Sequence, residues 1–123
     1  MQPMLILQTA LVILTVSAVG GVVMALICFT MGANPPAWLA MAHGFLSAAA
    51  VTLLLYAAVV IGLPDFADIA LVLFLVAATG GAVLNLRYHW KALPLPKWLV
   101  FVHAALAVAG YACLLVAVFA VPV

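Results

Sequence analysis

The sequence predicts an all-α integral membrane protein, a four-helix bundle made of two parallel helical-hairpin repeats. Hydrophobic residues make up 72% of the 123 positions and charged residues only 4%, whereas a soluble domain has about half its residues apolar and about a quarter charged. Four apolar stretches are each long enough to cross a hydrocarbon core, which takes about 20 helical residues. The second half of the chain also repeats the first with an offset of sixty residues.

The apolar stretches predict one transmembrane domain over residues 1–123, with spans at about 4–31, 36–62, 65–90 and 96–121. Proline fits the first turn of a helix, where its missing N–H has no partner to lose, so Pro36 and Pro96 are expected to begin helices. Asp65 is expected to cap the third helix, and Asp68 suits the positive end of that helix's dipole. Strands are excluded because a lipid-exposed sheet edge leaves backbone groups unpaired.

The three basic residues predict the orientation. Arg87, Lys91 and Lys97 flank the third loop, which is therefore expected on the cytoplasmic side of a cell inner membrane. Four spans then place both termini on the non-cytoplasmic side. The first segment lacks a basic n-region and its apolar run exceeds that of a signal peptide, so we expect it to remain as a helix.

The internal repeat relates residues 10–63 to residues 70–123, with 18 of 54 positions identical. The matched motif is Gly20-Gly21 followed by Pro36-x-Trp38-Leu39-x-x-x-His43, which recurs as Gly80-Gly81 followed by Pro96-x-Trp98-Leu99-x-x-x-His103. Two hairpins in series have the same orientation, so the halves are expected to be related by a pseudo-two-fold axis along the membrane normal. The second and fourth helices then fit diagonal positions of the bundle.

One imidazole from each half is expected at the same depth. His43 and His103 each lie seven residues past their proline, which is about 10 Å into the helix at 1.5 Å per residue. Small residues share their helix faces at i+4 and i+7, and glycines of the neighbouring helices fall at the same height; these residues are Ser47, Ala50, Ala107, Gly110, Gly20 and Gly80. Either the helices pack closely there, or a flat ring lies against the glycine backbone.

Ionisable residues within a membrane span usually face the interior and point to function. Two opposed imidazoles could serve as the axial ligands of one haem b, which needs only two side chains. Zinc and copper sites generally need three or four ligands, and no third candidate lies clearly at this height. Imidazole donors could instead hold the carbonyl oxygens of a quinone. The alternative without a ligand is that both histidines are hydrogen-bonded core residues.

Arg87 lies near the end of the third span, where the propionates of a haem would need cationic partners. The basic cluster also has a simpler explanation as the topology signal, with tryptophans at the interface. Covalently attached haem is excluded because the chain has no C-x-x-C-H motif. Cys28 and Cys113 fit best as small core residues.

Several function classes are excluded. A net charge of +1 offers no basic face for nucleic acid. A proton-coupled exporter needs a membrane-embedded carboxylate, and the only two carboxylates, Asp65 and Asp68, lie at a helix terminus. The chain also has no activated nucleophile for hydrolysis. The expected arrangement is similar to the four-helix membrane cytochromes of b type, and this similarity is one of architecture.

The sequence therefore predicts a small membrane haem protein that carries electrons within the bilayer, with His43 and His103 as ligands. It would act as an electron carrier or subunit rather than as a stand-alone enzyme. Its partners would be the lipid bilayer and a larger membrane oxidoreductase or further copies of itself. The alternative is a cofactor-free accessory or assembly subunit of a larger membrane complex.

Overall fold

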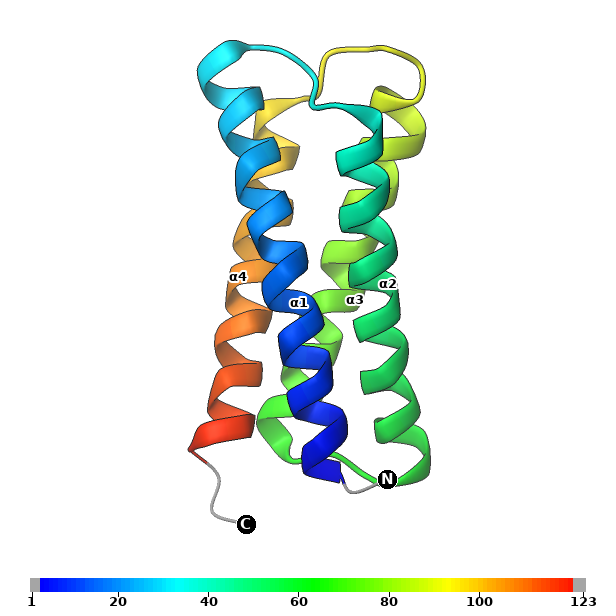
Figure 1. Cartoon of the computed structure of the whole chain (residues 1–123), viewed down its shortest axis with the longest axis vertical. Helices are drawn as coiled ribbons and strands as arrows, with labels where there is room; N and C mark the ends of the chain where they lie inside the picture. The colour runs from blue at the N-terminus through cyan, green and yellow to red at the C-terminus, as the bar shows by residue number, and fades with distance from the viewer. Residues whose placement is uncertain (1–2, 121–123) are drawn as a thin grey trace.

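The computed structural model describes residues 3–120, which form an all-helical bundle (Figure 1). Helix α1 (Pro3–Leu26) continues through a π-helical segment, η1 (Ile27–Met31), and α3 (Asp65–Val83) continues through a second one, η2 (Leu84–His89). The other two helices are α2 (Ala37–Val60) and α4 (Lys97–Phe119). All four helical runs are long and apolar enough to cross a membrane, which places the protein in a lipid bilayer as a multi-pass protein.

The helix starts differ from expectation by one residue. Pro36 and Pro96 occupy the position just before their helices, which begin at Ala37 and Lys97. Asp65 was expected as a cap, and this was wrong: Pro64 holds that position, and Asp65 is the first helical residue, with no side-chain cap. The proline conformation, with φ of −68° and ψ of 151°, already directs the Pro64 carbonyl to accept the N–H groups of Ala67 and Asp68. The expected end of the fourth span, residue 121, lies outside the described residues.

Two glycines end helices by adopting a left-handed backbone. Gly32 has φ of +62° after η1, and Gly62 has φ of +88° after α2. The Gly62 N–H donates to the carbonyl of Ala57. Side chains at such a φ clash with the backbone, so glycine is favoured at both turns.

The helices are arranged as two hairpins side by side. α1 packs mainly on α2 and α3 mainly on α4, while sparser α1–α4 and α2–α3 contacts close the bundle. This order puts α2 and α4 on one diagonal. At one end the two loops meet, because the Asn34 amide donates to the carbonyl of Leu93 and accepts from the N–H of Leu95. Nearby, Nε2–H of His89 donates to the carbonyl of Pro35 at 2.7 Å.

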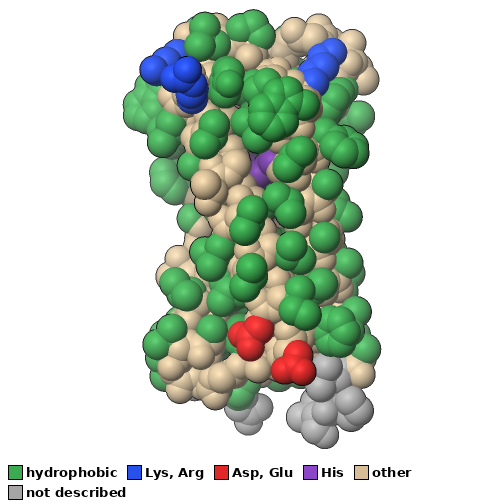
Figure 2. Space-filling model, turned by 180° about the vertical axis from the view of Figure 1, so that it is seen from behind, with side chains coloured by type: hydrophobic (Ala, Val, Ile, Leu, Met, Phe, Trp, Pro, Cys, Tyr) green, Lys and Arg blue, Asp and Glu red, His purple; other side chains and the backbone are tan. Residues whose placement is uncertain are grey.

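Charges lie only at the ends of the bundle. Figure 2 shows lysine and arginine side chains at one end and the acidic side chains near the other, with an apolar wall between them. Large apolar side chains exposed on this wall include Val12, Phe45, Val59 and Val108. A wall of this composition matches hydrocarbon rather than water.

The interior is divided into two packed regions. The larger lies toward the acidic end and contains residues such as Leu7, Leu54, Phe74 and Leu114. The smaller consists of Cys28, Leu84 and Val100, near the basic end. Between them the core is interrupted: no residue of 18–27, 37–49, 78–83 or 101–109 is fully buried. The fully buried core is therefore interrupted over about three helical turns, and both core histidines lie at this level.

Buried positions recur along the chain with an offset of sixty. Ala10, Leu11, Leu14 and Ser17 are buried in α1, and the corresponding residues of α3 are Ala70, Leu71, Phe74 and Ala77, also buried. Ala50, Leu54 and Ala57 of α2 correspond in the same way to Gly110, Leu114 and Ala117 of α4. The two hairpins thus use matching faces to build the larger packed region.

Candidate functional site

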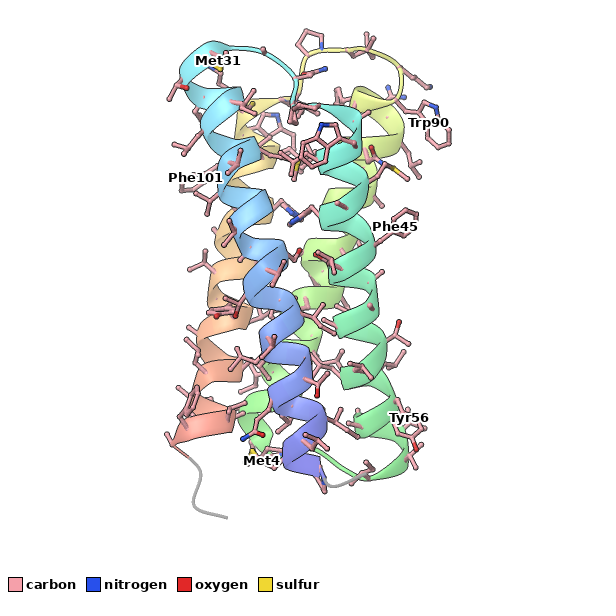
Figure 3. The ribbon with its side chains drawn as sticks, viewed as in Figure 1. Met4, Met31, Phe45, Tyr56, Trp90 and Phe101 are labelled. Carbon is pink, nitrogen blue, oxygen red and sulfur yellow. The ribbon has the colours of Figure 1, made fainter. Side chains whose placement is uncertain are left out.

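His43 of α2 and His103 of α4 approach each other across the interrupted part of the core. Their ring centroids are 6.3 Å apart, and the ring planes meet at 74°. Phe45 and Phe101, two residues away on the same helices, project outward from the bundle (Figure 3). Since two residues turn a helix by more than half a circle, the histidines face inward on both helices.

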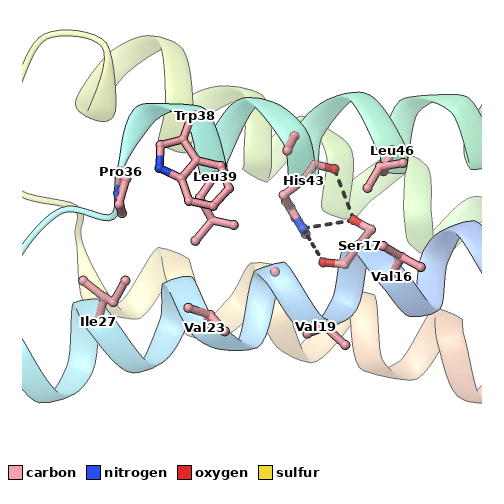
Figure 4. A pocket seen from close by; sticks show the side chains of 12 residues that line it. Val16, Ser17, Val19, Val23, Ile27, Pro36, Trp38, Leu39, His43 and Leu46 are labelled. Atoms are coloured by element: carbon pink, nitrogen blue, oxygen red, sulfur yellow. Dashed lines mark hydrogen bonds between the residues drawn. The ribbon is translucent and has the colours of Figure 1, made fainter.

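The ring of His43 is fixed by Ser17 of α1 (Figure 4). Its Nδ1 lies 2.8 Å from the Ser17 carbonyl and 3.0 Å from the Ser17 hydroxyl. A carbonyl only accepts, so Nδ1 carries the proton and Nε2 carries a lone pair. The Ser17 hydroxyl donates to the His43 carbonyl at 3.1 Å and lies 2.7 Å from the Ser47 hydroxyl, which donates to it.

The ring of His103 is held by backbone alone. Its Nδ1–H donates to the carbonyl of Ala77 at 2.7 Å. The partner again lies 26 residues earlier in the chain, as Ser17 does for His43. This bond fixes the same tautomer, with the lone pair on Nε2.

Glycine lets each imidazole lie against the backbone of the neighbouring helix. A Cβ added at Gly21 would lie 3.0 Å from Cε1 of His43, and one added at Gly81 would lie 3.0 Å from Cε1 of His103. Contacts this short are rare for a real Cβ, so a side chain at either position would displace the ring. Gly21 and Gly81 thus define one wall beside each imidazole.

Both Nε2 atoms remain available. Within residues 3–120, neither makes a hydrogen bond to protein, whereas both Nδ1 atoms do. No fully buried side-chain nitrogen or oxygen of this region lacks a partner, so each Nε2 retains contact with open space. A histidine that donates Nδ1–H to a backbone carbonyl and presents a free Nε2 has the usual arrangement of a metal-binding imidazole.

A groove of about 500 Å³ runs between α1 and α2 from His43 toward the basic end (Figure 4). Its lining is apolar except at Ser17 and His43, and it includes Gly20, Val23, Trp38 and Leu39. Figure 2 also shows a histidine side chain through the apolar wall on the opposite face. The part of the bundle at the level of the two histidines is therefore open to the surrounding bilayer.

The remaining predicted site residues lie at different distances from the imidazoles. A Cβ at Gly20 or Gly80 would meet the Cβ of the corresponding histidine at 4.0 or 3.8 Å, and Ser47 contacts Ser17. Gly110 instead packs against the ring of Phe74, and the Arg87 side chain is exposed.

Sequence reasoning missed three contributors to the site. Gly21 and Gly81 belong to the repeated Gly-Gly pairs, but the pairs alone do not say which glycine faces the ring. Ser17 gave no signal, because a lone serine in an apolar helix is typical of close packing.

The described residues hold no group of three or more histidine, cysteine or acidic side chains suited to a metal ion. The site is therefore a pair of imidazoles. Comparison with protein-family models, with curated proteins and with solved structures finds no match.

Proposed function

We propose that the protein binds one haem b between His43 and His103 and carries electrons within the membrane. The ring separation is the observation that supports this most directly. When two imidazoles bind one ion from opposite sides through Nε2, with metal–nitrogen bonds of about 2 Å, their ring centroids are about 6 Å apart. The separation here is 6.3 Å. A bound haem would supply one-electron chemistry at its iron.

The donor set also fits iron in a haem better than a bare metal ion. Two Nε2 lone pairs complete the coordination of a haem iron, whose other ligands come from the macrocycle. Zinc and copper would need a third or fourth ligand, and the described residues provide none at this level.

The packing around the imidazoles supports a flat group. The residues facing the imidazoles from the neighbouring helices are small, as at Gly21 and Gly81, and a groove of about 500 Å³ opens beside His43 between α1 and α2. The larger packed region and the aspartates lie toward the acidic end of the bundle. The propionates would therefore point toward the basic end, where Arg87, Lys91 and Lys97 lie.

An internal duplication would explain why the site has two similar halves. The recurrence of buried positions and the matching Nδ1–carbonyl bonds of His43 and His103 support it. In this proposal each hairpin contributes one ligand and one glycine wall, related by an axis along the membrane normal. A lone haem suits an electron carrier, so its partners would be a larger membrane oxidoreductase, a quinone or a second copy of this chain.

An absorption spectrum tests this proposal. The protein is purified from haem-replete cells, or mixed with haemin, and recorded oxidised and after dithionite. Low-spin bis-imidazole haem would give a sharp Soret band and a narrow α band on reduction. A preparation that stays colourless in both cases would overturn the proposal.

A second candidate is a cofactor-free subunit that packs against a larger membrane complex. One observation favours it: each imidazole already bonds the backbone of its own hairpin and lies against glycine, so the histidines could brace the hairpins without a ligand. Under this proposal haemin would leave the spectrum and the thermal stability of the protein unchanged. The protein itself would also co-purify with other membrane proteins in mild detergent.

A further inference from the structure

The two histidines differ in one respect, and the difference lies in a pair of hydroxyl groups. The Ser17 hydroxyl contacts both Nδ1 and the carbonyl of His43, and the Ser47 hydroxyl contacts the Ser17 hydroxyl. The corresponding residues beside His103 are Ala77 and Ala107, which offer only the Ala77 carbonyl. The glycine contacts of the two rings, in contrast, are the same to within 0.1 Å for the nearest three ring atoms.

Ser17 is a polar residue in an unusual position. Among residues 3–120 it is the one buried polar side chain, with 2% of its surface exposed. Burying a hydroxyl is costly unless it is hydrogen-bonded, and Ser17 is fully bonded: it donates to the His43 carbonyl and accepts from Ser47 and from His43 Nδ1. Its backbone carbonyl contacts the same Nδ1. One residue therefore binds His43 through both its backbone and its side chain.

We propose that Ser17 is a positioning residue that makes the two imidazoles chemically unequal. Nδ1–H of His43 has two acceptors, so its ring is more firmly oriented and its Nε2 more electron-rich than that of His103. Ser47 supports this by donating to the Ser17 hydroxyl, which leaves the Ser17 proton directed at the His43 carbonyl. Partners that bind the second nitrogen of a metal-binding histidine fix its orientation and raise its basicity. As a statement about haem ligands this rests on the proposed function, whereas the inequality of the two rings does not.

The first test needs no cofactor. The protein is labelled with ¹⁵N-histidine in detergent micelles, and solvent exchange of the Nδ1 protons is measured by NMR. With one additional acceptor, the His43 proton should exchange about fivefold more slowly than the His103 proton. Ser17→Ala should bring the two rates together, and Ala77→Ser should slow exchange at His103. Equal rates in the wild-type protein would overturn the proposal without any variant.

The matched control is Thr52→Ala. The Thr52 hydroxyl is exposed and bonds only the Ala48 carbonyl of its own helix, so its loss should leave both exchange rates unchanged. Ser47→Ala provides a milder change than Ser17→Ala and should accelerate exchange at His43 to a smaller extent. If Ser17→Ala does not fold, Ser47→Ala and the comparison of the two rates in the wild-type protein still decide whether the two rings are unequal.

The second test uses the haem-loaded protein. Ser17→Ala should raise the midpoint reduction potential, because a less electron-rich imidazole stabilises ferric iron less well, while Thr52→Ala should leave the potential unchanged. An unchanged potential in Ser17→Ala would contradict the ligand part of the proposal. Failure of the wild-type protein to bind haem would overturn the proposed function. The proton-exchange result would still decide whether the two rings are unequal.

Discussion

Gly110 and Phe74 share one space between α3 and α4. A Cβ built at Gly110 would lie 3.0 Å from Cε1 of Phe74 and 3.1 Å from its Cδ1. The corresponding residues of the first hairpin are Ala50 and Leu14, and all four are buried. The second hairpin thus combines a larger side chain on one helix with a smaller one on the other.

This relationship predicts that Gly110→Ala destabilises the protein. The added methyl would press on an aromatic ring in a packed region, and overpacking of this kind costs about 1–3 kcal/mol. The double variant Gly110→Ala with Phe74→Leu restores the pair found in the first hairpin and should recover most of the loss. The free energy of unfolding in mixed micelles measures both. A double variant less stable than Gly110→Ala would contradict the assignment of Gly110 to packing.

The four long apolar helices were predictable because composition alone dictates them. A chain with five charged side chains must place its apolar segments in lipid, and helices are the structures that satisfy their backbone there. The helical runs α1–η1, α2, α3–η2 and α4 begin and end within two residues of the expected apolar stretches wherever the structure describes them, and the membrane bounds of the spans stay a prediction. The π-helical segments could not be predicted, because i→i+5 bonding is rare in proteins.

The details of the site were less predictable than its location. The sequence predicted that His43 and His103 face each other, as they do with centroids 6.3 Å apart, and their role as ligands stays a prediction. The glycine that faces each ring follows from helix rotation, and one residue changes that by about 100°. The sequence also grouped Gly110 with the site, although it packs on Phe74. The contacts of Ser17 depend on how close α1 approaches α2, which no spacing within the chain reveals.

The basic end of the bundle is predicted to face the cytoplasm. Arg87, Lys91 and Lys97 are the only lysine and arginine residues of the chain, and positive loops are retained on the cytoplasmic side. The C-terminus should then lie outside the cytoplasm. Alkaline phosphatase, which is active only outside the cytoplasm, should therefore be active when fused after Val123. Activity of a cytoplasmic reporter such as green fluorescent protein at the same position would reverse the orientation.

Replacing either core histidine should abolish low-spin haem binding. His43→Ala and His103→Ala each remove one of the two free Nε2 atoms, leaving at most a single protein ligand. His89→Ala is the matched control, since Nε2–H of His89 is committed to the Pro35 carbonyl at the basic end. The reduced α band reports the outcome in all three variants. Normal spectra in both core variants would require other ligands.

Gly21→Ala and Gly81→Ala should weaken haem binding while leaving the histidines in place. The new methyl group would stand 3.0 Å from Cε1 of His43 or of His103, and the ring must turn or the helices must separate to relieve this contact. Metal sites lose about 10–100-fold in affinity when the groups that orient a ligand are disturbed. Titration of the apoprotein with haemin measures the loss.

Gly44→Ala is the control for this pair. Gly44 is a helical glycine beside His43, but a Cβ there meets nothing within 4 Å, so affinity should be unchanged. Helix propensity alone favours alanine by about 1 kcal/mol at all three positions. A lower affinity at Gly21 and Gly81 therefore isolates the contact with the imidazole from any effect on the helix. Equal affinities in all three variants would show that the glycine walls do not orient the rings.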